Sequence, residues 1–335
     1  MRHFSLKRSS FLSTLLAATA IAVCSNSALA QSRASDNFPS RPGVIVVPVQ
    51  PGSSSDAGAR LWAQVLSEAL GKPFVLDFKP GGGGVIGMNF VAKAPPDGHA
   101  MVFVASTFTS LPAFMPDLPF DPIKDFAPVS QLTKRSVLLV VTPSFPARNF
   151  QDYLAYAKIN PAKINMGTTG VGGSFHMVGA MFVNAADIKV TFIHYKGSAQ
   201  NFVDLAAGRL HSSPMTVYAA LPQLKAGKVR AIGYLSAQRS PWLPDLPTVA
   251  EQIQPGFDYT SWAALFATGG TPRDVIAKLS KPIMTYARSA EGIAKASAQG
   301  DELVGSTPEE LAALVAREVP RWKKVVKDND IKPEE

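Results

Sequence analysis

Short apolar runs alternate along the chain with segments whose apolar residues recur at helical spacing. Residues 44–47 form a continuous β-branched run, which is typical of a strand buried on both faces. A helical pattern follows over 61–70, and further strands are expected at 74–78 and 101–105, with a short helix at 85–93 between them. This order predicts a βαβαβ unit, which implies a parallel sheet with right-handed crossovers.

A second alternating unit begins near residue 136. Its expected elements are, in chain order, a strand at 137–141, a helix at 150–158, a strand at 163–167, a helix at 175–183, a strand at 190–194, a helix at 200–207 and a strand at 229–235. The tail is helical, with starts at Thr271 and Thr307 that each place Thr at the N-cap, Pro next and an acid at the third helical position. Because no flexible linker separates the two units, we expect the chain to cross between two α/β lobes more than once.

The first 30 residues carry the features of a signal peptide. Arg2, Lys7 and Arg8 precede an apolar stretch at 11–23, and a small-x-small pattern ends at Ala30. The stretch is shorter than the roughly 20 residues that cross a bilayer. We therefore expect cleavage after Ala30 and export of residues 31–335. A membrane anchor is the alternative, and Cys24 raises a lipoprotein variant in which Val23 fits poorly.

Composition narrows the class of function. The chain has 335 residues with 46% hydrophobic side chains and a formal net charge of +8, and the positive charges form no run, which disfavours a nucleic-acid binder. Its single Cys lies in the predicted signal peptide, so the exported part has no disulfide, thiolate nucleophile or Cys metal site. The five histidines include no closely spaced ligand pair. We expect neither a metal nor a cofactor.

The loop after the first strand is the first candidate binding element. In an open parallel sheet, ligands bind outside the carboxyl ends of the strands. Here Gly52 allows unusual backbone angles, Ser53, Ser54 and Ser55 offer hydroxyls, and the following helix presents free N–H groups and its positive dipole end. These groups suit a carboxylate. The alternative is a capping box with nothing bound, and Asp56 is expected to cap or brace the loop, because its charge would repel an anion.

A glycine-rich loop at 167–176 repeats this arrangement in the second unit. Thr168 and Thr169 precede a turn that contains Gly172 and Ser174 and that opens a helix. No acid follows a strand at the spacing that a dinucleotide site needs, so we reject that interpretation. Ser174 and His176 are two residues apart at a helix start and point in different directions, which disfavours a nucleophile–base pair. His176 is expected to brace the loop.

Two other turns have weaker signals. The glycine run at 81–84 is not followed by Lys and Ser or Thr, so it is not a P-loop and is expected to be a tight turn. Tyr195 and Lys196 place an aromatic ring and a cation after the strand at 190–194. A plain surface loop is an equally good interpretation of this pair.

Ordered motifs over nearly all of the exported chain resemble one family. They lie at 38–42, 47–60, 79–87, 94–99, 118–122, 170–176, 194–199, 224–231 and 243–251. The chain resembles the Bug receptors, the extracytoplasmic solute-binding proteins of tripartite tricarboxylate transporters.

The resemblance implies an α/β architecture of the type II periplasmic-binding-protein (Venus-flytrap) fold, with two α/β lobes joined by crossing hinge strands. One lobe is expected to comprise 31–135 and 245–335, and the other 136–244. Family receptors hold a ligand carboxylate between the two loops. Carried over to this chain, the site residues are Gly52, Ser53, Ser54, Ser55, Thr168, Thr169, Gly172 and Ser174, with Ser106, Thr107, Tyr195 and Lys196 as cleft walls.

The resemblance also implies what the protein does. It is expected to be a monomeric periplasmic receptor, not an enzyme, which captures a di- or tricarboxylate or an aromatic acid and delivers it to the membrane permease subunits of the transporter. A sensor for a membrane kinase and an exported hydrolase that uses Ser174 remain as alternatives.

Departures from the family pattern bear on the ligand. Ser53 and Ser54 add hydroxyls and bulk where paired glycines are usual. His211 to Met215 replaces a stretch that commonly contains two acids. Since an ammonium would need an acidic partner, amino-acid ligands are disfavoured, and an apolar or aromatic acid is favoured.

Overall fold

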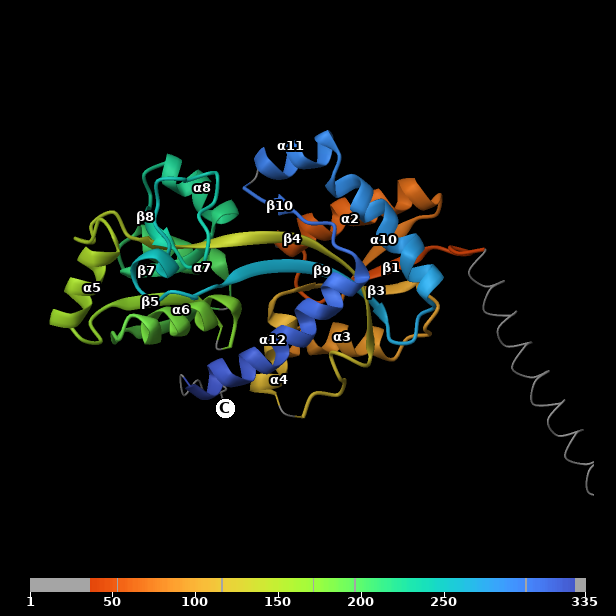
Figure 1. The fold of residues 1–335 in the computed structure, drawn as a ribbon, viewed down its shortest axis with the longest axis horizontal. Helices are drawn as coiled ribbons and strands as arrows, with labels where there is room; N and C mark the ends of the chain where they lie inside the picture. Colours follow the sequence, from red (N-terminus) through yellow and green to blue (C-terminus); the bar gives the residue numbers. More distant parts are fainter. Residues whose placement is uncertain are drawn as a thin grey trace, which may run out of the picture.

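A computed structural model describes residues 37–52, 54–115, 117–170, 172–195, 197–298 and 300–328. The predicted signal peptide at 1–30 lies outside these residues. Two halves, each built of strands and helices, lie side by side and are joined by two long strands (Figure 1).

The first half contains the expected parallel unit. Strands β1 and β2 pair in parallel, and β1 also pairs in parallel with β3. The elements are β1 (Gly43–Val47), α2 (Ser54–Leu70), β2 (Phe74–Phe78), the 3-10 turn η1 (Gly82–Gly84), α3 (Val85–Ala92), β3 (Ala100–Ala105) and α4 (Thr107–Phe114). The predicted βαβαβ unit is confirmed, while α4 was not predicted.

Two long antiparallel strands connect the halves. They are β4 (Phe126–Val141) and β9 (Thr260–Thr268), which pair with each other from Phe126 to Ser136. Strand β9 also pairs with β3, and the end of β4 pairs with β7 and β8 of the second half. The result is one continuous path of strands, β2-β1-β3-β9-β4-β7-β5-β6. The sequence predicted only the last part of β4 and none of β9, because the first part of β4 mixes polar with apolar residues.

The second half follows the predicted alternation with one shift, and it has three elements that were not predicted, at 212–216, 217–225 and 249–252. Its elements are α5 (Phe150–Ile159), β5 (Asn165–Thr169), α6 (Ser174–Ala185), β6 (Thr191–Tyr195), α7 (Ser198–Ala206), β7 (Ser212–Thr216), α8 (Val217–Lys225), β8 (Arg230–Tyr234) and α9 (Val249–Gln252). Strand β5 begins and ends two residues later than the predicted strand at 163–167, because Thr168 and Thr169 pair in parallel with His194 and Tyr195 of β6. Both threonines therefore end a strand rather than belong to the loop.

The C-terminal part consists of α10 (Arg273–Ala287), α11 (Ala290–Ala298), β10 (Glu302–Leu303) and α12 (Pro308–Asp328). At Thr307 the predicted cap is confirmed: the Glu310 N–H donates to the Thr307 hydroxyl over 3.2 Å, and the Thr307 N–H donates to the Glu310 carboxylate over 2.8 Å. At Thr271 the prediction is wrong. The Thr271 hydroxyl donates to the Thr268 carbonyl oxygen instead, and Pro272 occupies the cap position.

Separate apolar cores stabilise the halves, and α12 packs against two of them. Its Leu311 and Val315 lie in a core of the first half with Phe108 and Phe266. Its Trp322 lies in a core of the second half. A fully buried large apolar side chain contributes about 1.5–3 kcal/mol, so α12 stabilises the contact between the halves as well as the first half itself.

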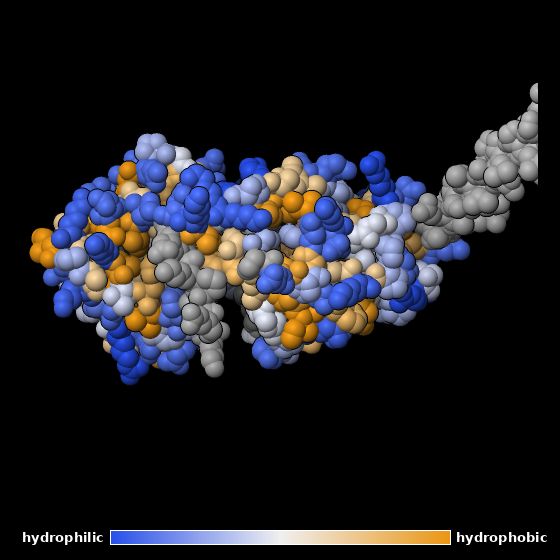
Figure 2. All heavy atoms as spheres, turned by 90° about the horizontal axis from the view of Figure 1, so that it is seen from below, coloured by the Kyte–Doolittle hydropathy of each residue, from blue (hydrophilic) through white to orange (hydrophobic). Residues whose placement is uncertain are grey.

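Polar side chains cover much of the outside of both halves, and apolar residues are interspersed among them (Figure 2). Seen from this side, an indentation separates the halves. None of the helices in the described parts of the chain combines the length and the apolar character that a membrane-crossing helix needs.

Candidate ligand-binding site

A cavity of about 560 Å³ lies between the two halves. This volume is in the range of small-molecule sites, about 300–1,000 Å³. Strands β3, β9, β4 and β7 contribute Phe103, Ser261, Arg135 and Met215 to its lining. The loops that follow β1 and β5 contribute to the same lining, so the cavity lies at the carboxyl ends of these parallel strands, as the general rule for open sheets predicts.

The first loop is braced by Asp56. Gly52 has a φ of 84°, and its N–H donates to the Asp56 carboxylate over 2.8 Å. The Gly52 N–H and the Arg60 guanidinium, 2.7 Å from the same carboxylate, hold the pKa of Asp56 below its usual range. The carboxylate of Asp56 is therefore engaged within the loop and the first turns of α2. Gly52 and Ser55 line the cavity next to this brace.

The second loop is a tight connection between β5 and α6. Gly173 caps α6, and a Cβ atom at this position would lie 2.1 Å from the Thr169 carbonyl oxygen. The Gly172 N–H donates to Nδ1 of His176 over 3.0 Å. Burial, and secondarily the neighbouring His194, lower the pKa of His176 to about 4, so its ring is neutral at neutral pH, as acceptance at Nδ1 requires. His176 thus braces the loop that brings Thr169 and Ser174 to the cavity.

Hydroxyl groups from both halves meet beside these loops. The hydroxyl oxygens of Ser106 and Ser174 are 3.4 Å apart. Both side chains lie near the hydroxyl of Tyr259, whose pKa burial raises to about 12. Together with the N-termini of α2 and α6, these hydroxyls form an environment that suits an oxyanion.

The structure brings four predicted site residues together in the cavity wall: Gly52, Ser55, Thr169 and Ser174. Others contact the protein itself. The buried Thr168 hydroxyl is 2.6 Å from Nδ1 of His194, the Gly172 N–H is bonded to His176, and the Tyr195 hydroxyl donates to Asp204 over 2.8 Å.

The remaining predicted site residues either do not line the cavity or lie outside the described residues. Ser106 is 3% exposed and reaches the site only through Ser174, and Thr107 begins α4 without lining the cavity. Ser53, Lys196 and the side chain of Ser54 lie outside the described residues. For every site residue predicted from the sequence, contact with a ligand stays a prediction.

Sequence reasoning missed the floor of the cavity. Arg135, Tyr218 and Trp262 line it, and none was a candidate. Arg135 is the one charged side chain among the described residues of the lining. The sequence signal for Arg135 was a cation in a polar stretch directly before the predicted strand at 137–141. This signal becomes informative only when that strand is known to cross between the halves.

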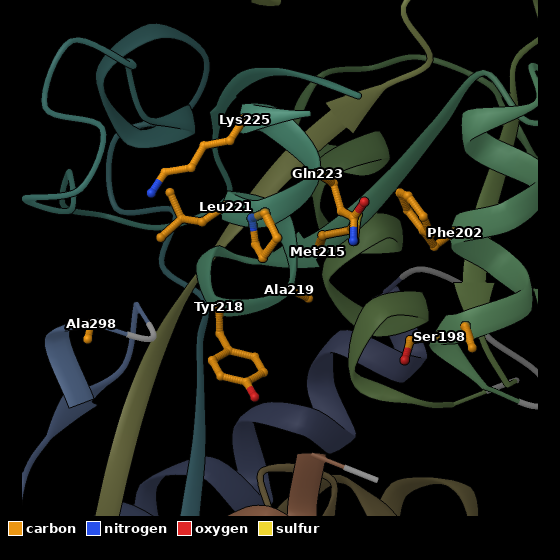
Figure 3. Close-up of a pocket in the computed structure, with 11 residues that line it drawn as sticks. Ser198, Phe202, Met215, Tyr218, Ala219, Leu221, Gln223, Lys225 and Ala298 are labelled. Atoms are coloured by element: carbon orange, nitrogen blue, oxygen red, sulfur yellow. The ribbon is translucent and has the colours of Figure 1, made fainter. Parts of the chain in front are cut away.

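The cavity continues into a groove of about 650 Å³ between α7 and α8. Phe202, Met215 and Tyr218 line both. Figure 3 shows Phe202 of α7 facing Gln223 of α8, Tyr218 extending from the start of α8, and Lys225 at the opposite end of the helix, directed away from Ser198. A ligand in the cavity therefore has an apolar extension beside it.

The predicted alternatives to binding find little support in this geometry. The Nδ1 atom of His176 accepts the Gly172 N–H, and the Ser174 hydroxyl lies 3.4 Å from that of Ser106, so this pair makes no nucleophile–base hydrogen bond. Over the described part of the chain, no group of three or more His, Cys, Asp or Glu side chains is placed to hold a metal ion.

Comparison with known proteins identifies the family. Residues 59–331 match the model of the tripartite tricarboxylate transporter family receptor. The chain belongs to this family. It is similar to the protein of the tcbD–tcbE intergenic region of a Pseudomonas species, with 35% identity over 313 residues and 93% of each chain covered. It is also similar to BugT of Bordetella pertussis, with 31% identity over 299 residues, 89% of this chain and 92% of BugT.

Solved structures of similar proteins have the same fold. An R. palustris protein solved with adipate gives a TM-score of 0.81 at 33% identity, covering 89% of this chain and 100% of that one. MatC of Rhodopseudomonas palustris, solved with bound malate, gives 0.76 at 30% identity, covering 86% and 100%. The periplasmic binding protein BugD gives 0.78 at 30% identity, covering 89% and 100%. The resemblance to Bug receptors and the fold predicted from it are confirmed, and the family consists of periplasmic solute-binding receptors rather than enzymes.

Proposed function

We propose that this chain is a periplasmic receptor that captures an organic carboxylate between its two ligand loops and delivers it to the membrane permease subunits of a tripartite tricarboxylate transporter. The observation that carries the proposal is the convergence of both loops on one cavity whose described lining contains no acidic side chain. A carboxylate that leaves water must regain hydrogen bonds. The N-termini of α2 and α6 and the hydroxyls of Ser55, Thr169 and Ser174 can supply them.

The proposed ligand class is a di- or tricarboxylate or an aromatic acid. Two solved relatives hold dicarboxylates, adipate and malate. An amino acid fits less well, because its ammonium group would find no acidic partner among the described lining residues.

The proposed cycle is a hinge closure. Residues 31–135 and 245–335 would form one lobe and 136–244 the other, after a signal peptide is removed behind Ala30. Strands β4 and β9 are the connections about which the lobes would turn. We propose that the receptor works as a monomer, because each chain contains both loops of one site.

A thermal-shift titration of residues 31–335 tests the carboxylate assignment. The panel contains succinate, malate, adipate, citrate and terephthalate, each beside its uncharged amide. A carboxylate present at about 100 times its dissociation constant adds roughly 2.7 kcal/mol to the free energy of unfolding, which raises the melting temperature by several degrees. We expect a selective shift with at least one acid and none with its amide. Equal shifts with acids and amides, or no shift with any acid, would contradict the proposal.

A further inference from the structure

Arg135 lies on a strand that crosses between the halves, and it lines the cavity. It lies on β4, where it pairs with Ser261 of β9, and it lines the cavity together with that residue. Its side chain is 17% exposed. With Phe103 and Tyr218 it also forms the wall shared with a neighbouring cavity of about 410 Å³. The guanidinium group is therefore held between the two halves of the molecule and on the floor of the proposed ligand site.

The guanidinium is fixed along one edge and open along the other. Its Nε donates to Oδ1 of Asp301 over 2.5 Å and its Nη2 donates to Oδ2 over 2.6 Å. Its Cζ lies 5.2 Å from the centre of the Tyr218 ring. Arginine has five N–H donors, and Asp301 takes two, so both donors of Nη1 and the second donor of Nη2 remain. One donor of Nη1 and the remaining donor of Nη2 form the end-on edge, which matches a carboxylate bidentately.

Resting on the proposed function, we infer that Arg135 binds a second carboxylate at the distal end of the ligand, so that the receptor selects dianions with two separated carboxylates. The proximal carboxylate lies at the two loops. Strand β4 is three strands from β1 and two strands from β5, or about 10–15 Å, which leaves room for a spacer between the two carboxylates. Phe103, Phe202 and Met215 line the space between and provide an apolar surface for that spacer.

Asp301 acts as a positioning residue in this arrangement. Its side chain is 9% exposed and pairs with the side-on edge of Arg135. The end-on edge of the guanidinium therefore faces away from Asp301. Other nearby cations are engaged or remote. Lys134 lies 2.6 Å from Glu302, and Lys295 lies 2.7 Å from Glu291. Lys225 lines the groove between α7 and α8 but not the cavity.

Matched ligands test the inference. Adipate and hexanoate, succinate and butyrate, and terephthalate and 4-methylbenzoate each differ by one carboxylate. Isothermal titration of residues 31–335 should show tighter binding of the dianion in at least one pair, by roughly 10- to 100-fold, as expected for a charge-assisted bidentate contact. Arg135→Gln should remove that preference, and it should change the affinity for the monocarboxylate by less than about threefold. Arg135→Lys should restore part of it, since lysine keeps the charge but not the fork.

Two further variants keep the test decisive. Arg135→Gln leaves Asp301 buried without its partner, which can destabilise the fold, so Arg135→Gln/Asp301→Asn removes both charges and should show the same loss of preference. Lys225→Gln is the control, because it removes one positive charge from the groove outside the cavity, and it should keep the preference.

Each outcome bears on one proposal or the other. Wild-type protein that binds monocarboxylates as tightly as dicarboxylates would overturn the role of Arg135 and leave the carboxylate receptor standing. The same follows if the Arg135 variants keep the preference, or if Lys225→Gln loses it equally. Failure of every acid to bind would instead overturn the proposed function.

Discussion

Replacing Gly173 with alanine is expected to weaken carboxylate binding by roughly 100-fold or more, since each lost hydrogen bond to a charged group is worth about 1.5–3 kcal/mol and the change displaces several donors. The new Cβ would lie 2.1 Å from the Thr169 carbonyl oxygen, and a backbone atom cannot rotate away as a side chain does. The turn between β5 and α6 must therefore open. Thr169 and Ser174, which line the cavity on either side of this turn, would move with it.

Gly197→Ala separates displacement of the backbone from added bulk in the cavity wall. Gly197 caps α7 as Gly173 caps α6 and lines the same cavity, its backbone is extended, and nothing lies within 4 Å of a Cβ built there. We expect a smaller loss of affinity than in Gly173→Ala, since no backbone group has to move and only one methyl group is added. Titration calorimetry of both variants with the acid that gives the largest thermal shift measures the difference. Wild-type affinity in Gly173→Ala would show that the second loop does not hold the carboxylate.

Acid is expected to destabilise the second loop through His176. Burial lowers its folded-state pKa to about 4 from the usual 6.5, so the unfolded chain takes up a proton over this range while the folded protein does not. Stability that His176 gives above about pH 6.5 is therefore lost as the pH falls towards 4, by roughly 2–3 kcal/mol between about pH 7.5 and about pH 4.5. Protonation at Nδ1 would also break the bond from the Gly172 N–H.

Asparagine at position 176 separates this effect from general acid denaturation. Its side-chain oxygen can accept the Gly172 N–H, but it does not titrate. Urea unfolding at both pH values should show a smaller acid loss for His176→Asn than for the wild type. His211→Asn is the control: Nδ1 of His211 likewise accepts a backbone N–H, from Asn165 over 2.9 Å, while its lesser burial lowers its pKa less. Equal acid loss in the wild type and His176→Asn would contradict the buried neutral histidine.

The alternation of strands and helices could be predicted well where local pattern and tertiary role agree. Strand β1 is β-branched from Val44 to Val47 and buried except at the half-buried Val44, so its apolar run was decisive. Thr307 and Glu310 form a cap from residues three apart, which needs no distant partner. Thr271 shows the opposite case, because its hydroxyl bonds Thr268 at the end of a strand that was not predicted.

The two loops of the site could also be predicted, but the atoms that face the cavity could not. Thr168 and Thr169 are neighbours in sequence and alternate in direction along β5, so one bonds His194 and the other lines the cavity. Their assignment depended on a shift of two residues in the end of the strand. Arg135 and its bond to Asp301 join positions 166 residues apart, a contact that no local pattern indicates.

A crystal structure of residues 31–335 with the acid that gives the largest thermal shift tests the central claim most directly. We expect one carboxylate to lie against the first loop at Gly52 and Ser55 and the second loop at Thr169 and Ser174, within hydrogen-bond distance of groups from both. Electron density for the ligand in the groove between α7 and α8 alone, without a carboxylate at either loop, would contradict it.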